Sequence, residues 1–233
     1  MEFDKVIEKR ASYRNYNDQD VSYEDLMSVL NAARLAPSSG NLQNWSFIVV
    51  RKPELKEEIM KASMNQTWIL QAPVLIIVAS RNENIKRHYG DRGEKLYAIQ
   101  NCAAAINNLL LKSIDLGLAS CWINAFDDQV LKRILKLPDT VIPQAIISLG
   151  YSNDKVEKLK RYDLDLLVHF DEWNGKQAEG LFPLKQRIPN TKEMLGSGTE
   201  KTKGFFSNLM NKFKKKPKEE AKSAEQQEIQ NPV

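Results

Sequence analysis

The sequence predicts an α+β fold in which a mixed sheet packs between helices. Short apolar runs of strand length alternate irregularly with amphipathic helices, which disfavours a regular doubly wound sheet. No Gly-x-Gly-x-x-Gly fingerprint follows a strand, and there is no phosphate-binding P-loop. A chain of 233 residues with 42% apolar content is long enough to form one sizeable domain with its own core.

The N-terminal part of the chain predicts three helices and two strands. A short helix over residues 2–10 places Phe3, Val6 and Ile7 on one face. Ser22 is a suitable N-cap for a second helix, which runs into a loop beginning at Pro37. The remaining elements are a strand over 47–50, a helix opened by Pro53, and a strand over 74–79.

The following part is centred on one long helix over residues 94–116, which Gly117 ends. Before it, residues 81–93 are polar and contain two glycines, so we expect an exposed connection that could act as a substrate-facing lid. After it, we expect a strand over 119–123, a helix over 127–136 and a strand over 144–150.

Composition and charge narrow the class of protein. Cys102 and Cys121 are far apart in apolar surroundings, which indicates reduced core thiols and a cytoplasmic location. We see no signal peptide, no apolar run of membrane-spanning length and no metal-ligand spacing around the two histidines. Residues 1–190 carry 25 basic and 24 acidic side chains, so charge gives no reason to expect a nucleic-acid partner.

Two polar segments could hold a ligand. Arg10 and Arg14 flank Ser12 just beyond a helix, and two guanidiniums with a hydroxyl can bind a phosphate and a polyol. The alternative is a solvated basic helix end. The loop after Pro37 offers Ser38, Ser39 and Asn41 beside exposed backbone, which suits either a helix exit or a surface against a planar polar ligand.

Three segments together resemble the FMN-binding signatures of the nitroreductase family. They are residues 10–14 (RASYR), 36–45 (APSSGNLQNW) and 117–126 (GLASCWINAF), and the long alanine-containing helix before the third also agrees. The resemblance covers roughly residues 2–173. It implies an α+β flavoprotein that forms a domain-exchanged homodimer with two FMN molecules at the subunit interface.

The resemblance also implies a set of FMN-binding residues. Arg10, Ser12 and Arg14 would hold the phosphate, the ribityl chain and the pyrimidine edge, with Asn65 also at that edge. Pro37, Ser38, Ser39 and Asn41 would line the flavin from the partner subunit. Trp122, Ile123 and Asn124 would run beside the dimethylbenzene ring and N5. Lys160 and Arg161 match late phosphate ligands, although the charge run 155–161 could simply be solvated.

This resemblance implies hydride transfer from NAD(P)H through flavin N5 to a nitroaromatic, a quinone or an activated alkene, by a ping-pong mechanism. Flavin N5 carries the chemistry, so no catalytic side chain is expected. Two departures from the family pattern, Asn44 and Asn124, leave the acceptor open. A reductive dehalogenase, another specialised flavin enzyme of the same fold and a non-catalytic flavin-binding protein remain alternatives.

The C-terminal tail differs in composition from the rest. We expect an FMN-binding domain over residues 1–190 and a flexible basic tail over 191–233, where nine Lys oppose six Glu. A short amphipathic segment over 204–216 has aromatic residues on one face and lysines at its end. Peripheral contact of residues 203–218 with an anionic membrane is one interpretation, and a helix docked on the body is the other.

Overall fold

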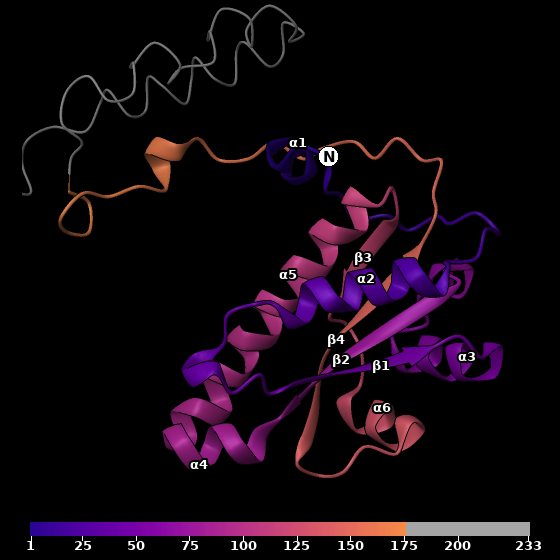
Figure 1. Cartoon of the computed structure of the whole chain (residues 1–233), viewed down its shortest axis with the longest axis horizontal. Helices are drawn as coiled ribbons and strands as arrows, with labels where there is room; N and C mark the ends of the chain where they lie inside the picture. Colours follow the sequence, from indigo (N-terminus) through magenta and orange to yellow (C-terminus); the bar gives the residue numbers. More distant parts are fainter. Residues whose placement is uncertain (176–233) are drawn as a thin grey trace, which may run out of the picture. The chain divides into compact units, whose positions relative to one another are not determined.

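A computed structural model describes residues 1–175 of the chain (Figure 1). The chain forms two compact units. The first unit is Met1–Leu159, and the second begins at Lys160. The predicted tail, with its amphipathic segment, lies outside the described residues. The 190/191 boundary and membrane contact therefore stay predictions. Within residues 1–175, no helix has both the length and the apolar character needed to cross a bilayer.

The first unit is built on a four-stranded sheet in the order β1-β2-β4-β3. Its strands are β1 (Trp45–Val50), β2 (Val74–Arg81), β3 (Ala119–Ile123) and β4 (Val141–Gly150). All three neighbouring pairs are antiparallel, so the expected mixed sheet was wrong. Irregular alternation of strands and helices does not fix strand direction, and here each strand runs opposite to its neighbour.

Helices cover both faces of this sheet because its central strands are apolar on both sides. Alternate β2 residues face opposite ways: Val74, Ile76 and Val78 pack in one cluster with α2 and α5. Leu75 and Ile77 pack in the other cluster, with Ile59 of α3 and Leu131 of α6. The result is a helix–sheet–helix arrangement with two cores, and the expected packing of the sheet between helices is confirmed.

The helices begin and end close to their expected positions. They are α1 (Phe3–Lys9), α2 (Tyr23–Arg34), α3 (Pro53–Ala62), α5 (Ala98–Asp115) and α6 (Asp128–Leu135). Ser22 caps α2 by accepting from the Asp25 backbone N–H at 3.0 Å, and Asp127 caps α6 by accepting from Val130 N–H at 2.9 Å. Pro53 occupies the first position of α3, where its missing N–H costs nothing.

The segment expected as an exposed connection is instead a helix. It forms α4 (Asn82–Arg92), which continues through a π-turn at Gly93–Tyr97 into α5. Only Ile85 and Asn82 of α4 are buried, so the segment is exposed as expected. It is a helix, however, and not the irregular connection that the sequence suggested. One fully buried isoleucine anchors the helix, and Gly90 breaks it with φ 59° and ψ −150°.

The described part of the second unit, residues 160–175, contains a single 3₁₀ turn at Leu164–Leu166. Several of its apolar side chains are exposed, among them Tyr162 and Trp173. The ring centroids of His169 and Trp173 lie 4.4 Å apart. Lys160 and Arg161, two of the expected phosphate ligands, open this unit and are both exposed.

Truncating a core side chain of α5 should destabilise the first unit. Leu109 is fully buried in the cluster with α2 and the sheet. Leu109→Ala should lower the free energy of unfolding by about 2–5 kcal/mol, because it removes buried methyl groups and leaves a cavity. Met27→Ala on α2, whose side chain is 44% exposed, is the control and should cost about 1 kcal/mol or less. Equal losses in urea unfolding would contradict this core assignment.

Alkaline pH should destabilise the fold through Cys102. Burial raises the pKa of this thiol from 9.0 to about 12. The unfolded state therefore loses its proton first, and the stabilisation present below pH 9 is lost as the pH rises to about 12. The loss should reach about 4 kcal/mol at most. Cys102→Ala should flatten this part of the pH profile, and an unchanged profile would contradict the assignment.

Candidate functional site

The residues between α1 and α2 form an extended arm along the free edge of β3; we call residues 10–17 the N-terminal arm. The Tyr13 backbone N–H donates to the Ser120 carbonyl at 3.1 Å, and Asn17 N–H donates to the Tyr151 carbonyl at 2.9 Å. Tyr16 is buried, and its hydroxyl lies 2.7 Å from Ser148 Oγ and 2.9 Å from the Tyr13 carbonyl. These contacts fix the backbone that carries the two arginines.

The arm presents two guanidiniums and a hydroxyl. Arg10 is half-buried, while Arg14 is exposed with its Cζ 5.9 Å from the centre of the Trp68 ring. Within residues 1–175, no ion pair or hydrogen bond of either guanidinium is found. Burial raises the pKa of the Cys121 thiol, and the nearby Arg14 and Ser12 side chains oppose that rise. Two cations without anionic partners suit an anionic ligand.

The turn after α3 lies against the end of β3. Gln66 Nε2 bridges these segments, donating to the Ser63 carbonyl at 3.0 Å and to the Ala125 carbonyl at 3.3 Å. Met64 and Asn65 have φ values of 54° and 53°, in the left-handed region. Such backbone recurs at ligand sites, where the surrounding structure holds it in place. The turn thus presents the exposed Asn65 side chain next to the segment that follows β3.

The end of β3 offers mainly backbone and one indole. Ile123 is 4% exposed and belongs to the core, so only its backbone can face a ligand. Trp122 is half-buried, and its Nε1 donates to Asn124 Oδ1 at 2.5 Å. This contact uses the Asn124 side-chain oxygen, and no hydrogen bond of its Nδ2 is found within residues 1–175.

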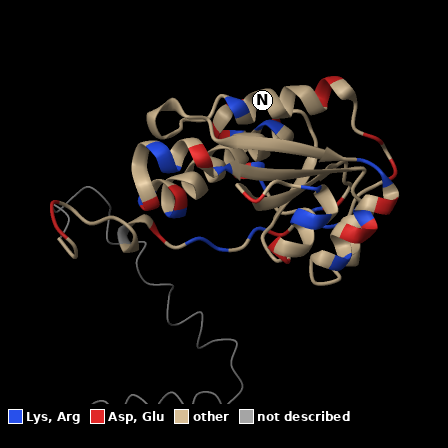
Figure 2. Ribbon diagram, turned by 90° about the horizontal axis from the view of Figure 1, so that it is seen from below, with Lys and Arg blue, Asp and Glu red and all other residues tan. Residues whose placement is uncertain are grey.

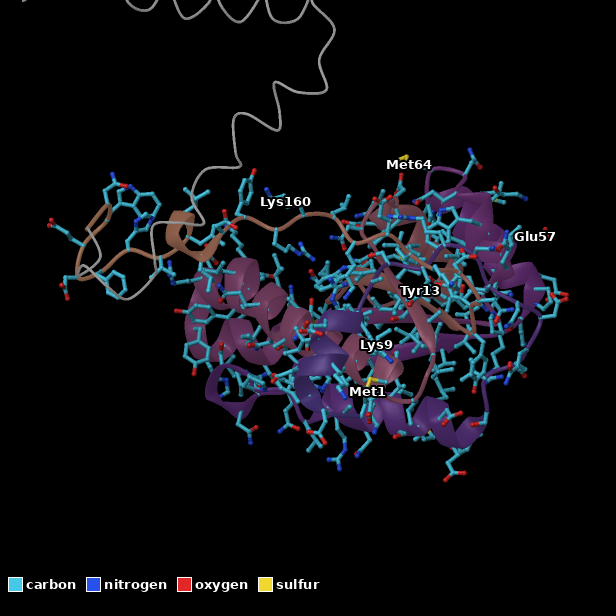
Figure 3. All side chains as sticks on the ribbon, turned by 90° about the horizontal axis from the view of Figure 1, so that it is seen from above. Met1, Lys9, Tyr13, Glu57, Met64 and Lys160 are labelled. Atoms are coloured by element: carbon cyan, nitrogen blue, oxygen red, sulfur yellow. The ribbon has the colours of Figure 1, made fainter. Side chains whose placement is uncertain are left out.

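These segments together define what we call the arm surface: the N-terminal arm, the 63–68 turn and the end of β3. Figure 3 labels Tyr13 on the arm and Met64 on the turn. Met64 is 69% exposed. The structure places Arg14 beside Trp68 and Ser12 near Cys121, and it places the turn that carries Asn65 beside the segment with Trp122 and Asn124. Arg10 lies at the start of the same arm. The cations, hydroxyl, amides and aromatic faces of these residues fit the phosphate, polyol and ring of FMN.

A second polar segment lies elsewhere in the first unit; we call residues 37–44 the Pro37 loop. It connects α2 to β1, and Figure 1 shows this connection beside α4 and the adjoining end of α5. Ser39 N–H donates to Asn101 Oδ1 at 3.0 Å, and Arg81 Nη2 donates to the Gln43 carbonyl at 3.0 Å. A Cβ built on Gly40 would lie 2.6 Å from the Tyr89 hydroxyl, so α4 packs directly on the loop.

No hydrogen bond found between described residues joins the Pro37 loop to the N-terminal arm. The loop leads into β1, at one edge of the sheet, whereas the arm lies along β3, at the other. Pro37 and Asn41 are exposed, and Ser38 Oγ accepts from Gln43 N–H at 3.0 Å while keeping its own proton to donate. One protomer therefore carries two separate polar surfaces.

Four residues outside the predicted set of site residues support these surfaces. Asn101 and Asn44 hold the Pro37 loop from beneath, and Tyr16 and Trp68 hold the arm. The sequence offered one sign of the role of Asn101, which is its position on the side of the long helix that was expected to be buried. A buried asparagine needs hydrogen-bond partners, so such a residue is expected to hold a neighbouring segment. Charge gives no further site: in Figure 2, basic and acidic positions intermingle over the helices of the first unit.

Comparisons with known proteins agree with the fold and the motifs. Residues 7–70 and 60–151 match the model of the nitroreductase family. A protein of Archaeoglobus fulgidus, named for NADH dehydrogenase/NAD(P)H nitroreductase activity, is 32% identical over 72% of this chain and 97% of its own. An FMN reductase [NAD(P)H] of Bacillus subtilis is 28% identical over 71% and 72%. The structure of B. megaterium NfrA2 matches with a TM-score of 0.70, at 24% identity, over 80% and 79%.

The four-stranded antiparallel sheet between helices defines an α+β protein, and its N-terminal arm carries two arginines. The matched family model and the A. fulgidus relative are more specific. The chain belongs to the nitroreductase family, and the resemblance seen in its sequence is confirmed. It is accordingly an oxidoreductase of that family.

Removing the Tyr16 hydroxyl should loosen the arm. Tyr16→Phe leaves Ser148 Oγ and the Tyr13 carbonyl without their shared partner in a buried place. We expect the free energy of unfolding to fall by roughly 1–3 kcal/mol in urea titrations. Tyr23→Phe is the matched control, since Tyr23 is 75% exposed, and it should change stability by about 0.5 kcal/mol or less. A Tyr16 variant as stable as the control would show that these contacts contribute little.

Proposed function

We propose that this chain is an FMN-dependent oxidoreductase that takes hydride from NADH or NADPH and passes it to a nitroaromatic, a quinone or an activated alkene. The observation that carries the proposal is the arm surface, where Arg10 and Arg14 flank Ser12 without anionic partners among the described residues. The family match and the names of relatives such as the B. subtilis FMN reductase support it.

The arm would bind the cofactor through charge and hydrogen bonds. Its guanidiniums can each give two parallel N–H donors to phosphate oxygens, and Ser12 can engage the polyol. The cation–π contact with Trp68 would favour one orientation of the Arg14 side chain and so lower the entropy lost on binding. Lys160 and Arg161 belong to the second unit, and their role as phosphate ligands stays a prediction from the resemblance.

The turn and the strand end would orient the ring. Asn65 would address its polar edge from a left-handed backbone position, with the Trp122–Asn124 segment alongside. When bound, FMN supplies the N5 centre that accepts and returns hydride. Donors and cations around the polar edge favour the negatively charged reduced form, because opposite charges attract strongly where water is excluded.

A second copy of the chain would complete the site. In this proposal the Pro37 loop of the partner lines the ring, contributing Pro37, Ser38, Ser39 and Asn41. The separation of the arm and the loop within one protomer supports this arrangement, since a site using both needs two chains. Donor and acceptor would then occupy the same slot in turn, giving ping-pong kinetics.

A flavin spectrum tests the function directly. The protein, as purified or after incubation with FMN, should show oxidised-flavin absorbance that bleaches anaerobically with NADH or NADPH and returns on adding a quinone or nitroaromatic. Initial rates at several fixed acceptor concentrations should give parallel double-reciprocal lines. A protein that takes up no FMN would overturn the proposal, whereas uptake without bleaching would favour a non-catalytic flavin-binding protein.

Removing one arm cation should weaken FMN binding. Arg14→Ala deletes charge-assisted hydrogen bonds, so the Kd for FMN should rise roughly 10- to 100-fold in fluorescence titrations. The control is Arg133→Ala, which removes an exposed guanidinium from the last turn of α6 and should leave the Kd unchanged. If both variants bind FMN like the wild type, the arm is not the phosphate site.

A further inference from the structure

We infer that Asn101 on α5 is the positioning residue that sets the conformation of the Pro37 loop, and with it the affinity for flavin. The inference rests on the proposed function, in which this loop lines the flavin ring. Asn101 lies outside all three sequence motifs, in the first turn of α5. It is 4% exposed, so its carboxamide is available only to the groups packed around it.

The oxygen of the Asn101 carboxamide binds the start of the loop, and its nitrogen binds the end of the loop. Its Oδ1 accepts from the Ser39 backbone N–H at 3.0 Å and from the Ser39 hydroxyl at 3.2 Å. Its Nδ2 donates to Asn44 Oδ1 at 2.7 Å, in a contact buried from solvent. One side chain thus fixes the spacing between the start of the loop and the start of β1.

The loop needs such a restraint because its backbone is not in a low-energy conformation. Gly40, Asn41 and Gln43 have φ values of 56°, 55° and 44°. Left-handed backbone costs little for glycine, but roughly 1–3 kcal/mol for other residues, and persists only where the surroundings impose it. The internal contacts of the loop, such as Ser38 Oγ with Gln43 N–H, do not tie it to the body of the protein.

Asn101 also determines which groups of the loop face outward. Because its Oδ1 takes both the Ser39 N–H and the Ser39 hydroxyl proton, Ser39 is turned toward α5. The donors left for a ligand are then the Ser38 hydroxyl and the Asn41 side chain. Without Asn101, the partly buried Ser39 would lose the partner of its donors and could rotate, which would change the surface presented to the ring.

The surroundings of the Asn44 side chain predict different effects on the loop for Asn101→Asp and Asn101→Ala. Asn44 is 2% exposed, and its Nδ2 has no partner among the described residues. In Asn101→Asp, one carboxylate oxygen still accepts from Ser39, and Asn44 can turn its amide to donate Nδ2 to the other. In Asn101→Ala, both links are lost. The aspartate variant should therefore preserve the loop and the alanine variant should not.

Amide hydrogen exchange and FMN titration together test the inference, with Asn108→Ala as the matched control. Asn108 lies on the same helix, and its Nδ2 donates to the Ala32 carbonyl at 3.2 Å, away from the loop. In the FMN-free protein, Asn101→Ala should speed exchange of the Ser39 amide about tenfold or more, while Asn101→Asp and Asn108→Ala stay within about threefold. The Kd for FMN should follow the same order, rising about tenfold only for Asn101→Ala.

The outcomes separate the inference from the proposed function. If the wild type takes up no FMN, the function fails, while the Ser39 exchange rates still report whether Asn101 holds the loop. If the wild type binds FMN and Asn101→Ala binds it equally well, the inference is overturned and the function stands. Should Asn101→Ala not fold, rapid Ser39 exchange in the wild type or a tenfold weaker Kd for Asn101→Asp would overturn the inference.

Discussion

The burial of β2 and β4 on both faces is the constraint on which the rest of the first unit depends. Seven of the eight β2 residues are buried, and only Arg81 at its end is exposed. A strand that is apolar on both sides must be covered on both sides, because uncovered apolar area costs about 25 cal/mol per Å². Hence α2 and α5 occupy one face, α3 and α6 the other, and the middle of the sheet holds few polar groups.

This constraint places the polar chemistry at the margins of the sheet. The N-terminal arm hydrogen-bonds to the edge strand β3, whose outer backbone groups would otherwise lack partners. The Pro37 loop sits where β1 begins and β2 ends, so Arg81 and Asn44 share a backbone hydrogen bond at 2.6 Å. Each surface is therefore attached to rigid strands and helices, although neither is regular structure itself.

Left-handed backbone marks both surfaces. Non-glycine residues with positive φ occur at Asn41 and Gln43 in the loop and at Met64 and Asn65 in the turn. Such residues are uncommon, and asparagine tolerates the region better than most. Strained backbone of this kind persists where neighbouring contacts hold it, and it is common at functional sites. Gln66 supplies those contacts in the turn, as Asn101 does in the loop.

The sequence by itself determined most of the local structure. Ser22, Pro53 and Asp127 placed helix starts because capping and proline geometry act within a few residues. The three motifs, taken with the long helix, were enough to indicate the family. Boundaries were missed where distant contacts decide them: β4 runs back through Pro143, which the sheet accommodates at an irregularity between Val78 and Ala79.

Only the tertiary structure decided how these pieces meet. Strand direction depends on the path of each connection, so the antiparallel sheet could not be inferred from the order of elements. A single buried Ile85 turned an apparently polar connection into α4. Asn44 and Asn101 are far apart in the sequence, and nothing local shows that their amides meet at 2.7 Å. Helix caps and backbone propensities depend on residues close together in the sequence, so the sequence shows them directly. Contacts between distant residues form only when the cores pack, so the tertiary structure is needed to show them.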